Sequence, residues 1–208
     1  MFVKLAAIFF SMILVNNYVL AKFLGICPFL GVSKKLDSAF GMSCAVIFVM
    51  TVATAVTFPL QIFVLDQFGL GYLQTIVFIL VIAVLVQFIE IFLKKYMVAL
   101  YNSLGVYLPL ITTNCAVLAV TILAISDFSA DVTTFGFGYA YLEALVCAVG
   151  SGAGFMLAMV MFSGVRKRVD ACKPPKVFEG LPITLIAAAV TSLSFMGFGG
   201  IVDGIFGL

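Results

Sequence analysis

The sequence predicts an all-α membrane protein with six transmembrane helices. Of its 208 residues, 64% are hydrophobic and only 10% are charged, whereas about a quarter of the residues of a soluble domain are charged. The apolar residues also form runs long enough to cross a hydrocarbon core, which takes about 20 helical residues. Because so little polar surface remains to face water, we expect one integral membrane domain over residues 1–208.

Six apolar runs predict the membrane helices, at residues 4–21, 39–63, 72–93, 103–125, 135–165 and 181–203. The first run could instead be a signal peptide cut after Ala21, but Asn16 and Asn17 interrupt it, and we expect a retained helix. The five connections contain three, none, two, none and five basic residues in chain order. Since basic residues favour the cytoplasmic side, this alternation predicts that both termini lie outside (N-out/C-out).

Two interruptions break this regular pattern. Residues 23–32 are apolar but too few to span a membrane, and they include Gly25 and Pro28, so we expect a re-entrant or broken half-helix. The fourth run contains a counterpart, a polar cluster over residues 112–114 that follows Pro109. Irregular backbone at membrane depth is tolerated only where it is buried in protein or lines a cavity, so both interruptions are candidate sites.

A short internal similarity relates these interruptions. Asn17–Ala21 (NYVLA) is similar to Asn114–Ala119 (NCAVLA). With three spans in each half, this similarity predicts two inverted three-helix repeats, roughly residues 1–98 and 99–208. Repeats of this kind place sites at interrupted helices near the membrane midplane.

Cys27 and Cys115 are the residues best suited to bind a cofactor. Each lies beside an interruption, where free backbone N–H groups favour the thiolate that binds metals; the alternative is that each is a small buried hydrophobic residue. An iron–sulfur cluster usually takes four thiolates, so a second chain would have to supply two, at a subunit interface. We expect Cys44 and Cys147 to pack in the core, and Cys172 to face the cytoplasm.

Several classes of function are excluded by what the sequence lacks. It contains no histidine, which removes His-ligated haem, His-bound zinc and Ser–His or Cys–His catalysis. It has no P-loop and no dinucleotide fingerprint, and Gly150, Gly152 and Gly154 instead predict close helix packing. No basic tract interleaved with aromatic residues suggests a nucleic-acid partner. We therefore predict no catalytic residue on this chain.

Polar residues inside the predicted spans are candidates for an ion pathway. Glu90 lies four residues before Lys94, so a simple helix pair accounts for it. Glu143 could assist an ion, form a pair or reach the membrane interface. The remaining candidates could bond broken backbone, bond between helices, or line an ion or cluster site: Asn16, Asn17, Thr112, Thr113 and Asn114.

The segments around both cysteines resemble a known family. Residues 16–35 (NNYVLAKFLGICPFLGVSKK), 108–117 (LPLITTNCAV) and 193–200 (LSFMGFGG) resemble the A subunit of the Rnf electron-transport complex, and the resemblance covers essentially the whole chain. The E subunit of the Na⁺-translocating NADH:quinone reductase has a similar layout. The Cys-Pro-Phe and Thr-Thr-Asn-Cys forms resemble the Rnf branch more closely.

This resemblance implies that Cys27 and Cys115 bind a [2Fe–2S] cluster within the bacterial cytoplasmic membrane. The other two ligands would come from a homologous E subunit of opposite topology, and the D, G, B and C subunits would complete the complex. That complex is an ion-transporting ferredoxin:NAD⁺ oxidoreductase coupled to Na⁺ or H⁺. The alternatives are an E-type subunit of the quinone reductase, a redox-inactive ion transporter, and a membrane scaffold. The coupling ion, the direction of electron flow and the stoichiometry are not predicted.

Overall fold

The computed structural model describes residues 2–32, 36–69, 71–96, 108–172, 175, 178 and 180–197. Every regular element within these ranges is helical, which confirms the predicted all-α class. The chain divides into two compact units, one formed by Met1–Cys44 with Gly150–Leu208 and the other by Ala45–Val149. We call them unit 1 and unit 2, and two long helices, α3 and α9, contribute residues to both.

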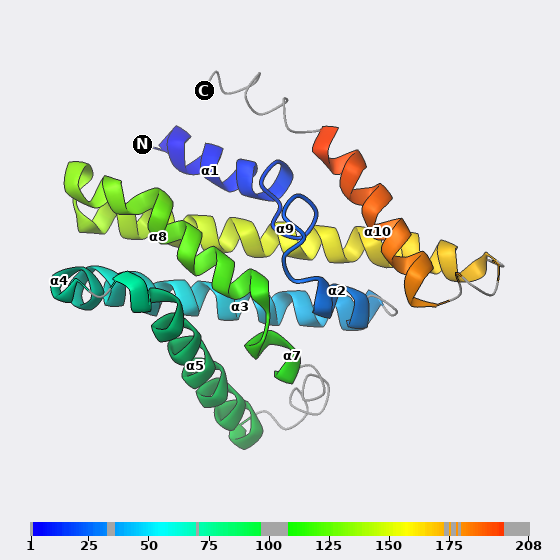
Figure 1. Ribbon diagram of the computed structural model, residues 1–208, viewed down its shortest axis with the longest axis horizontal. Helices are drawn as coiled ribbons and strands as arrows, with labels where there is room; N and C mark the ends of the chain where they lie inside the picture. Colours follow the sequence, from blue (N-terminus) through cyan, green and yellow to red (C-terminus); the bar gives the residue numbers. More distant parts are fainter. Residues whose placement is uncertain are drawn as a thin grey trace. The chain divides into compact units, whose positions relative to one another are not determined.

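Unit 1 is built around the second half of a long helix, α9. Its helices are α1 (Phe2–Leu14), α2 (Ile26–Val32), the start of α3 (Leu36–Leu60), the end of α9 (Phe137–Ala171) and α10 (Leu181–Met196) (Figure 1). A Cβ added to Gly150 would lie 3.2 Å from the Phe9 carbonyl oxygen, and one added to Gly154 would lie 2.9 Å from that of Met12. The glycines therefore let α1 lie directly on α9, as the sequence predicted.

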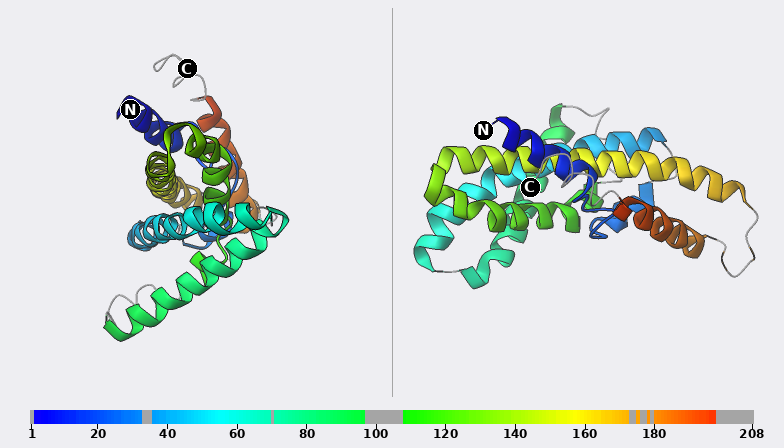
Figure 2. Two further views of the ribbon diagram at one scale, coloured as in Figure 1. Left: turned by 90° about the vertical axis from the view of Figure 1, so that its left-hand side faces the viewer. Right: turned by 90° about the horizontal axis from the view of Figure 1, so that it is seen from above.

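Unit 2 joins the rest of α3 to the helices that follow it. These are a π-helical turn (Gln61–Leu65), α4 (Asp66–Phe68), a 3₁₀ turn (Gly71–Leu73), α5 (Gln74–Tyr96), α7 (Leu108–Thr112), α8 (Cys115–Phe135) and the start of α9. After α4 the chain turns sharply, and α5 runs away from α3 at a wide angle (Figure 2). The α5 helix contacts both α7 and α8.

An aromatic cluster joins α3 to the start of α9 inside unit 2. Phe58 is 0% exposed, and its ring centroid lies 6.2 Å from that of Phe137 and 6.1 Å from that of Tyr141. The Tyr141 hydroxyl donates a long hydrogen bond of 3.4 Å to the Ala55 carbonyl oxygen. Such buried ring pairs add packing energy to the area that they remove from solvent or lipid.

Among the described residues, four helices are long and apolar enough to cross a membrane. They are Ser38–Phe68, Gly71–Ile91, Leu110–Ser129 and Phe137–Val169, and they match the second to fifth predicted spans. Lys4–Leu14 and Leu181–Met196 are shorter apolar helices. The protein is thus a membrane protein with several apolar helices, whereas six complete spans stay a prediction.

The predicted first helix, over residues 4–21, is wrong in its second half. Helix α1 ends at Leu14, and turns follow before α2 begins at Ile26. Phe23 and Gly25 have φ angles of 55° and 82°, a left-handed conformation that cannot continue a right-handed helix. The predicted half-helix after this break is confirmed by α2. The sixth helix ends at Met196, and residues 198–203 of that predicted span lie outside the described residues.

Candidate functional site

Cys27 is the second residue of the half-helix α2, and its side chain is exposed. The left-handed Gly25 directly before α2 is buried, which leaves little room for any side chain at a position whose φ already favours glycine. Pro28 occupies the first turn of α2, where the missing N–H costs no helical hydrogen bond. The local sequence therefore ends one helix, turns, and begins another with the Cys27 thiol uncovered by the chain.

Cys115 is the first residue of α8, and its side chain is also exposed. Helix α7 ends at Thr112, so the chain breaks between the two helices at residues 113 and 114, within the polar cluster that predicted an interruption. Asn114 caps α8, because its Oδ1 atom accepts a hydrogen bond of 3.0 Å from the backbone N–H of Ala116. The backbone N–H of Val117 in this first turn donates to the Asn114 carbonyl oxygen (3.1 Å).

Asn17 organises the longer break before Cys27. Its side chain is 1% exposed, and its Oδ1 atom accepts hydrogen bonds from the backbone N–H groups of Val19 (3.1 Å) and Leu20 (3.4 Å). Its Nδ2 atom donates to the carbonyl oxygens of Gly154 (2.8 Å) and Ile13 (3.3 Å). One amide therefore replaces the helical hydrogen bonds that the break removes and ties the loop to α9.

Two further side chains hold the Cys27 segment from distant parts of unit 1. The Arg166 guanidinium on α9 donates to the Leu30 carbonyl oxygen in α2, and the Ser192 hydroxyl on α10 donates to the Leu20 carbonyl oxygen in the loop. The sequence interpretation used Arg166 only as a topology signal and missed Ser192. No periodic pattern marks a lone serine in an apolar helix as a tether, so only the three-dimensional contact reveals it.

The two cysteines lie in different units of the fold, and the described residues form no metal-ligand group around either of them. Among the described residues, no group of three or more His, Cys, Asp or Glu side chains could hold a metal ion. Cys27 belongs to unit 1 and Cys115 to unit 2. Each exposed thiol lies at the start of its own helix, and a cluster with four thiolates shared with a second chain stays a prediction.

Comparison with known proteins identifies the family. The model of the Rnf-Nqr subunit family, described as a membrane protein, matches residues 5–202. The chain belongs to this family. It is 51% identical over 201 residues to the A subunit of the ion-translocating oxidoreductase complex of Syntrophotalea carbinolica, covering 97% of this chain and 99% of that relative. It is 50% identical to the A subunit of the Na⁺-translocating ferredoxin:NAD⁺ oxidoreductase complex of Acetobacterium woodii, covering 93% and 95%.

These relatives bear out the predicted resemblance to the A subunit of the Rnf complex. They do not assign a role to individual residues, so the part played by the two cysteines stays a prediction. In this chain, each cysteine motif lies at a break between helices.

The two asparagines of the internal similarity have the same local role. Asn17 and Asn114 are both buried, and each accepts a hydrogen bond at Oδ1 from the backbone N–H two residues further along the chain. They differ in the hydrogen bonds of the amide nitrogen. Asn17 Nδ2 donates to α9, whereas Asn114 Nδ2 is buried with no hydrogen-bond partner among the described residues. A buried donor of this kind is costly unless a ligand or another chain satisfies it.

The other polar candidates lie in varied settings. Glu143 is 0% exposed on α9, so its carboxylate is covered by other residues of the protein. Glu90 is half-buried on α5, and its predicted pairing with Lys94 stays a prediction. Asn16 is exposed, and its Nδ2 atom lies 3.4 Å from the Ser11 hydroxyl. Thr112 is half-buried and Thr113 is exposed.

The remaining cysteines divide between confirmed and wrong predictions. Cys147 is 0% exposed, as predicted for a core residue, and Cys172 is exposed as predicted. The prediction that Cys44 packs in the core is wrong, because its side chain is exposed. It lies one turn from Phe40 and Phe48, which are 54% and 57% exposed. This stripe of α3 faces away from the rest of the chain, toward lipid or a partner.

Proposed function

We propose that this chain is the A-type membrane subunit of an ion-translocating ferredoxin:NAD⁺ oxidoreductase complex and relays electrons through a [2Fe–2S] cluster shared with a homologous subunit. The names of the relatives at about half identity support the complex. One observation on the chain supports the relay: the cysteines of both matching motifs are exposed at the start of a helix that follows a break. The unrelated Cys147 is buried instead.

The donor chemistry of the chain fits such a group. Cys27 and Cys115 would each supply one thiolate, and the homologous E subunit of opposite topology would supply the other two. When bound, a cluster of this type accepts and releases one electron. Asn17 holds the loop that precedes Cys27, and Asn114 caps the helix that begins with Cys115, so they would help to position the two thiolates.

A topology of six spans with both termini outside fits this role. The first span would then be α1 with the turns up to Ala21, and α2 would be the re-entrant half-helix that follows Lys22. Lys94 and Lys95 lie in the last turn of α5, and Arg168 lies in the last turn of α9. The C-terminal ends of α5 and α9 would then face the cytoplasm of a bacterial cell, because basic residues favour the cytoplasmic side. The D, G, B and C subunits would be further partners.

Coupling to Na⁺ or H⁺ would act through the two breaks. Charge interacts strongly across a medium of low dielectric constant, and interrupted helices are the usual ion sites of transporters with repeats. The two breaks each contain a buried asparagine and are the segments of the chain nearest in sequence to the two thiolates. We expect the arrangement of these two breaks to control the access of the ion.

The test is the iron content and the reduced-state EPR spectrum of the complete complex, purified without oxygen. Cys27→Ser and Cys115→Ser should each remove the signal of the intramembrane cluster and reduce electron transfer. Cys44→Ser is the matched control, because Cys44 is equally a free, exposed cysteine but lies in a regular helix. The control should keep both the signal and the electron transfer.

Each alternative predicts a different outcome of the same experiment. Unchanged iron and activity in both site variants would refute the relay and favour a scaffold. Ion transport that survives the loss of both cysteines would favour a redox-inactive transporter. Electron transfer to a quinone in place of NAD⁺ would favour the E-type subunit of the quinone reductase.

A further inference from the structure

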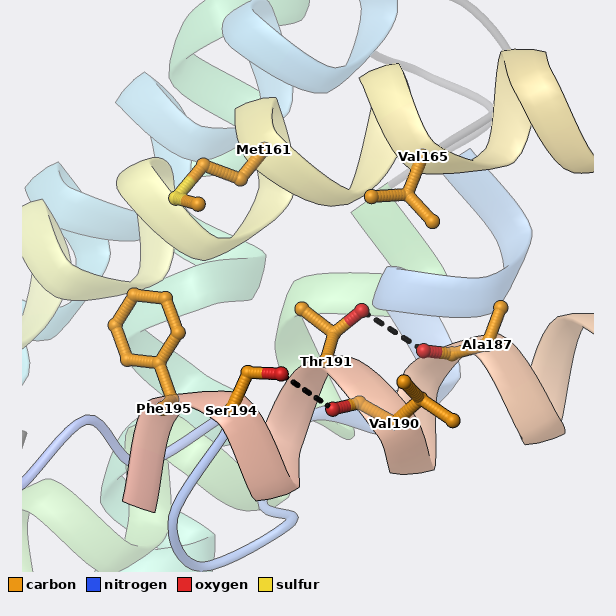
Figure 3. Close-up of a pocket in the computed structure, with 7 residues that line it drawn as sticks. All are labelled: Met161, Val165, Ala187, Val190, Thr191, Ser194 and Phe195. Atoms are coloured by element: carbon orange, nitrogen blue, oxygen red, sulfur yellow. Dashed lines mark hydrogen bonds between the residues drawn. The ribbon is translucent and has the colours of Figure 1, made fainter. Parts of the chain in front are cut away.

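We propose that a groove between α9 and α10 binds an anionic phospholipid, with an acyl chain in the groove and the headgroup beside Arg168. The groove lies within unit 1 and has a volume of about 520 Å³, inside the range of roughly 300–1,000 Å³ found for ligand sites. Met161 and Val165 line it from α9, while Ala187, Val190 and Phe195 line it from α10 (Figure 3). The site is separate from the cysteines, and its placement on the cytoplasmic side rests on the topology proposed above.

The walls of the groove favour hydrocarbon. Its two hydroxyl groups are satisfied within α10, since Thr191 Oγ1 donates to the Ala187 carbonyl oxygen (2.8 Å) and Ser194 Oγ donates to that of Val190 (3.0 Å) (Figure 3). Neither hydroxyl needs a partner from a ligand, and the other lining groups are aliphatic, aromatic or thioether. A polar occupant would leave its own groups unsatisfied there. The groove therefore fits an acyl chain.

One end of the groove carries positive charge. Met161, Val165 and Arg168 are spaced by four and three residues, so they lie on one stripe of α9, and Arg168 lies about one turn beyond the lining residue Val165. The Arg168 side chain is exposed. Because α10 runs opposite to α9 along the groove, its N-terminus at Leu181 lies toward the same end, where the helix dipole also favours an anion. Basic pockets between membrane helices on the cytoplasmic side bind anionic headgroups.

The dimensions of the groove favour a lipid over a helix of another protein chain. An α-helix has a diameter of about 10 Å and rises about 5.4 Å per turn, so a volume of this size would hold little more than roughly one turn. A single acyl chain is far narrower and can extend along the groove. Met161 and Val190 are 47% and 59% exposed, which leaves the groove open for a chain to enter from the bilayer.

The test uses native mass spectrometry of the complete complex, exchanged into equal amounts of phosphatidylglycerol and phosphatidylcholine with identical acyl chains. Wild type should retain phosphatidylglycerol in preference. Arg168→Gln should reduce that retention about five-fold, the effect expected of one basic residue at an anionic surface. Lys167→Gln is the matched control, because Lys167 is also exposed but lies off the stripe, and it should change retention less than about two-fold.

Two further variants test the apolar part of the groove. Ala187→Phe fills the groove and should abolish retention of phosphatidylglycerol, and Ser194→Phe does the same from an exposed position that tolerates a large side chain. Equal retention of both lipids by wild type overturns the proposal, as does an equal effect of the substitutions at 167 and 168. Disulfide or chemical crosslinking of Val190→Cys to a helix of another protein chain would also overturn it.

Discussion

Replacement of Asn17 by alanine tests whether one buried amide holds the loop that precedes Cys27. The side chain makes four hydrogen bonds, two of them short: Nδ2 to the Gly154 carbonyl oxygen at 2.8 Å and Oδ1 from the Val19 N–H at 3.1 Å. The other two, to Ile13 and from Leu20, are longer at 3.3 and 3.4 Å. Alanine removes all four and leaves buried backbone groups without a partner.

The size of the effect follows from these contacts. A hydrogen bond contributes about 1 kcal/mol to stability in water, and about 0.6 kcal/mol on average between membrane helices. Counting the two short bonds fully and the two long ones in part gives a loss of about 2 kcal/mol. Each 1.4 kcal/mol is a factor of ten in an equilibrium constant, so the open form of the loop should become roughly 30-fold more populated.

Amide hydrogen exchange measures this opening directly. In the solubilised complex, the amides of Val19 and Leu20 should exchange roughly 30-fold faster in Asn17→Ala, because exchange follows the population of the open form. Asn16→Ala is the control, since Asn16 is exposed and its amide makes only one long contact of 3.4 Å, to Ser11. Equal protection in the two variants would show that Asn17 does not hold the loop.

Three other substitutions test the packing and the second break. Gly154→Ala should destabilise the chain by about 1–3 kcal/mol in thermal unfolding, because its Cβ would meet backbone of α1 at 2.9 Å. Gly164→Ala, on the same helix with nothing within 4 Å, should be neutral or stabilising, and a similar loss at both sites would contradict the close-packing argument. Phe58→Ala should cost about 3–5 kcal/mol in the same assay. Phe68→Ala, at 72% exposure, should change little, and comparable costs would argue against the aromatic core of unit 2. Asn114→Ala should lower helix stability at the start of α8 by about 1 kcal/mol, seen as faster amide exchange there, and unchanged exchange would argue against its capping role.

The sequence predicted the apolar helices well but not where they end. Hydrophobicity located the second to fifth spans, because a run of apolar residues reflects the thickness of the bilayer. The break between α1 and α2 depends on hydrogen bonds from Asn17 to α9 and on left-handed residues at 23 and 25. A contact between residues 137 positions apart leaves no local pattern. The core prediction for Cys44 was wrong for a related reason, since in an apolar membrane helix the lipid-facing and core-facing residues are chemically alike.

The cysteine motifs were more predictable than the helices around them, because glycine, proline and asparagine cluster beside both cysteines, whereas the single Pro59 and the glycines of α9 lie within continuous helices. Asn17 and Asn114 accept the same local backbone hydrogen bond at the two breaks, while the inverted repeats stay a prediction. The two breaks still differ in length, with turns over residues 15–25 in the first and residues 113 and 114 alone in the second. What the halves share is therefore the chemistry of the break, a buried amide that replaces lost helical hydrogen bonds.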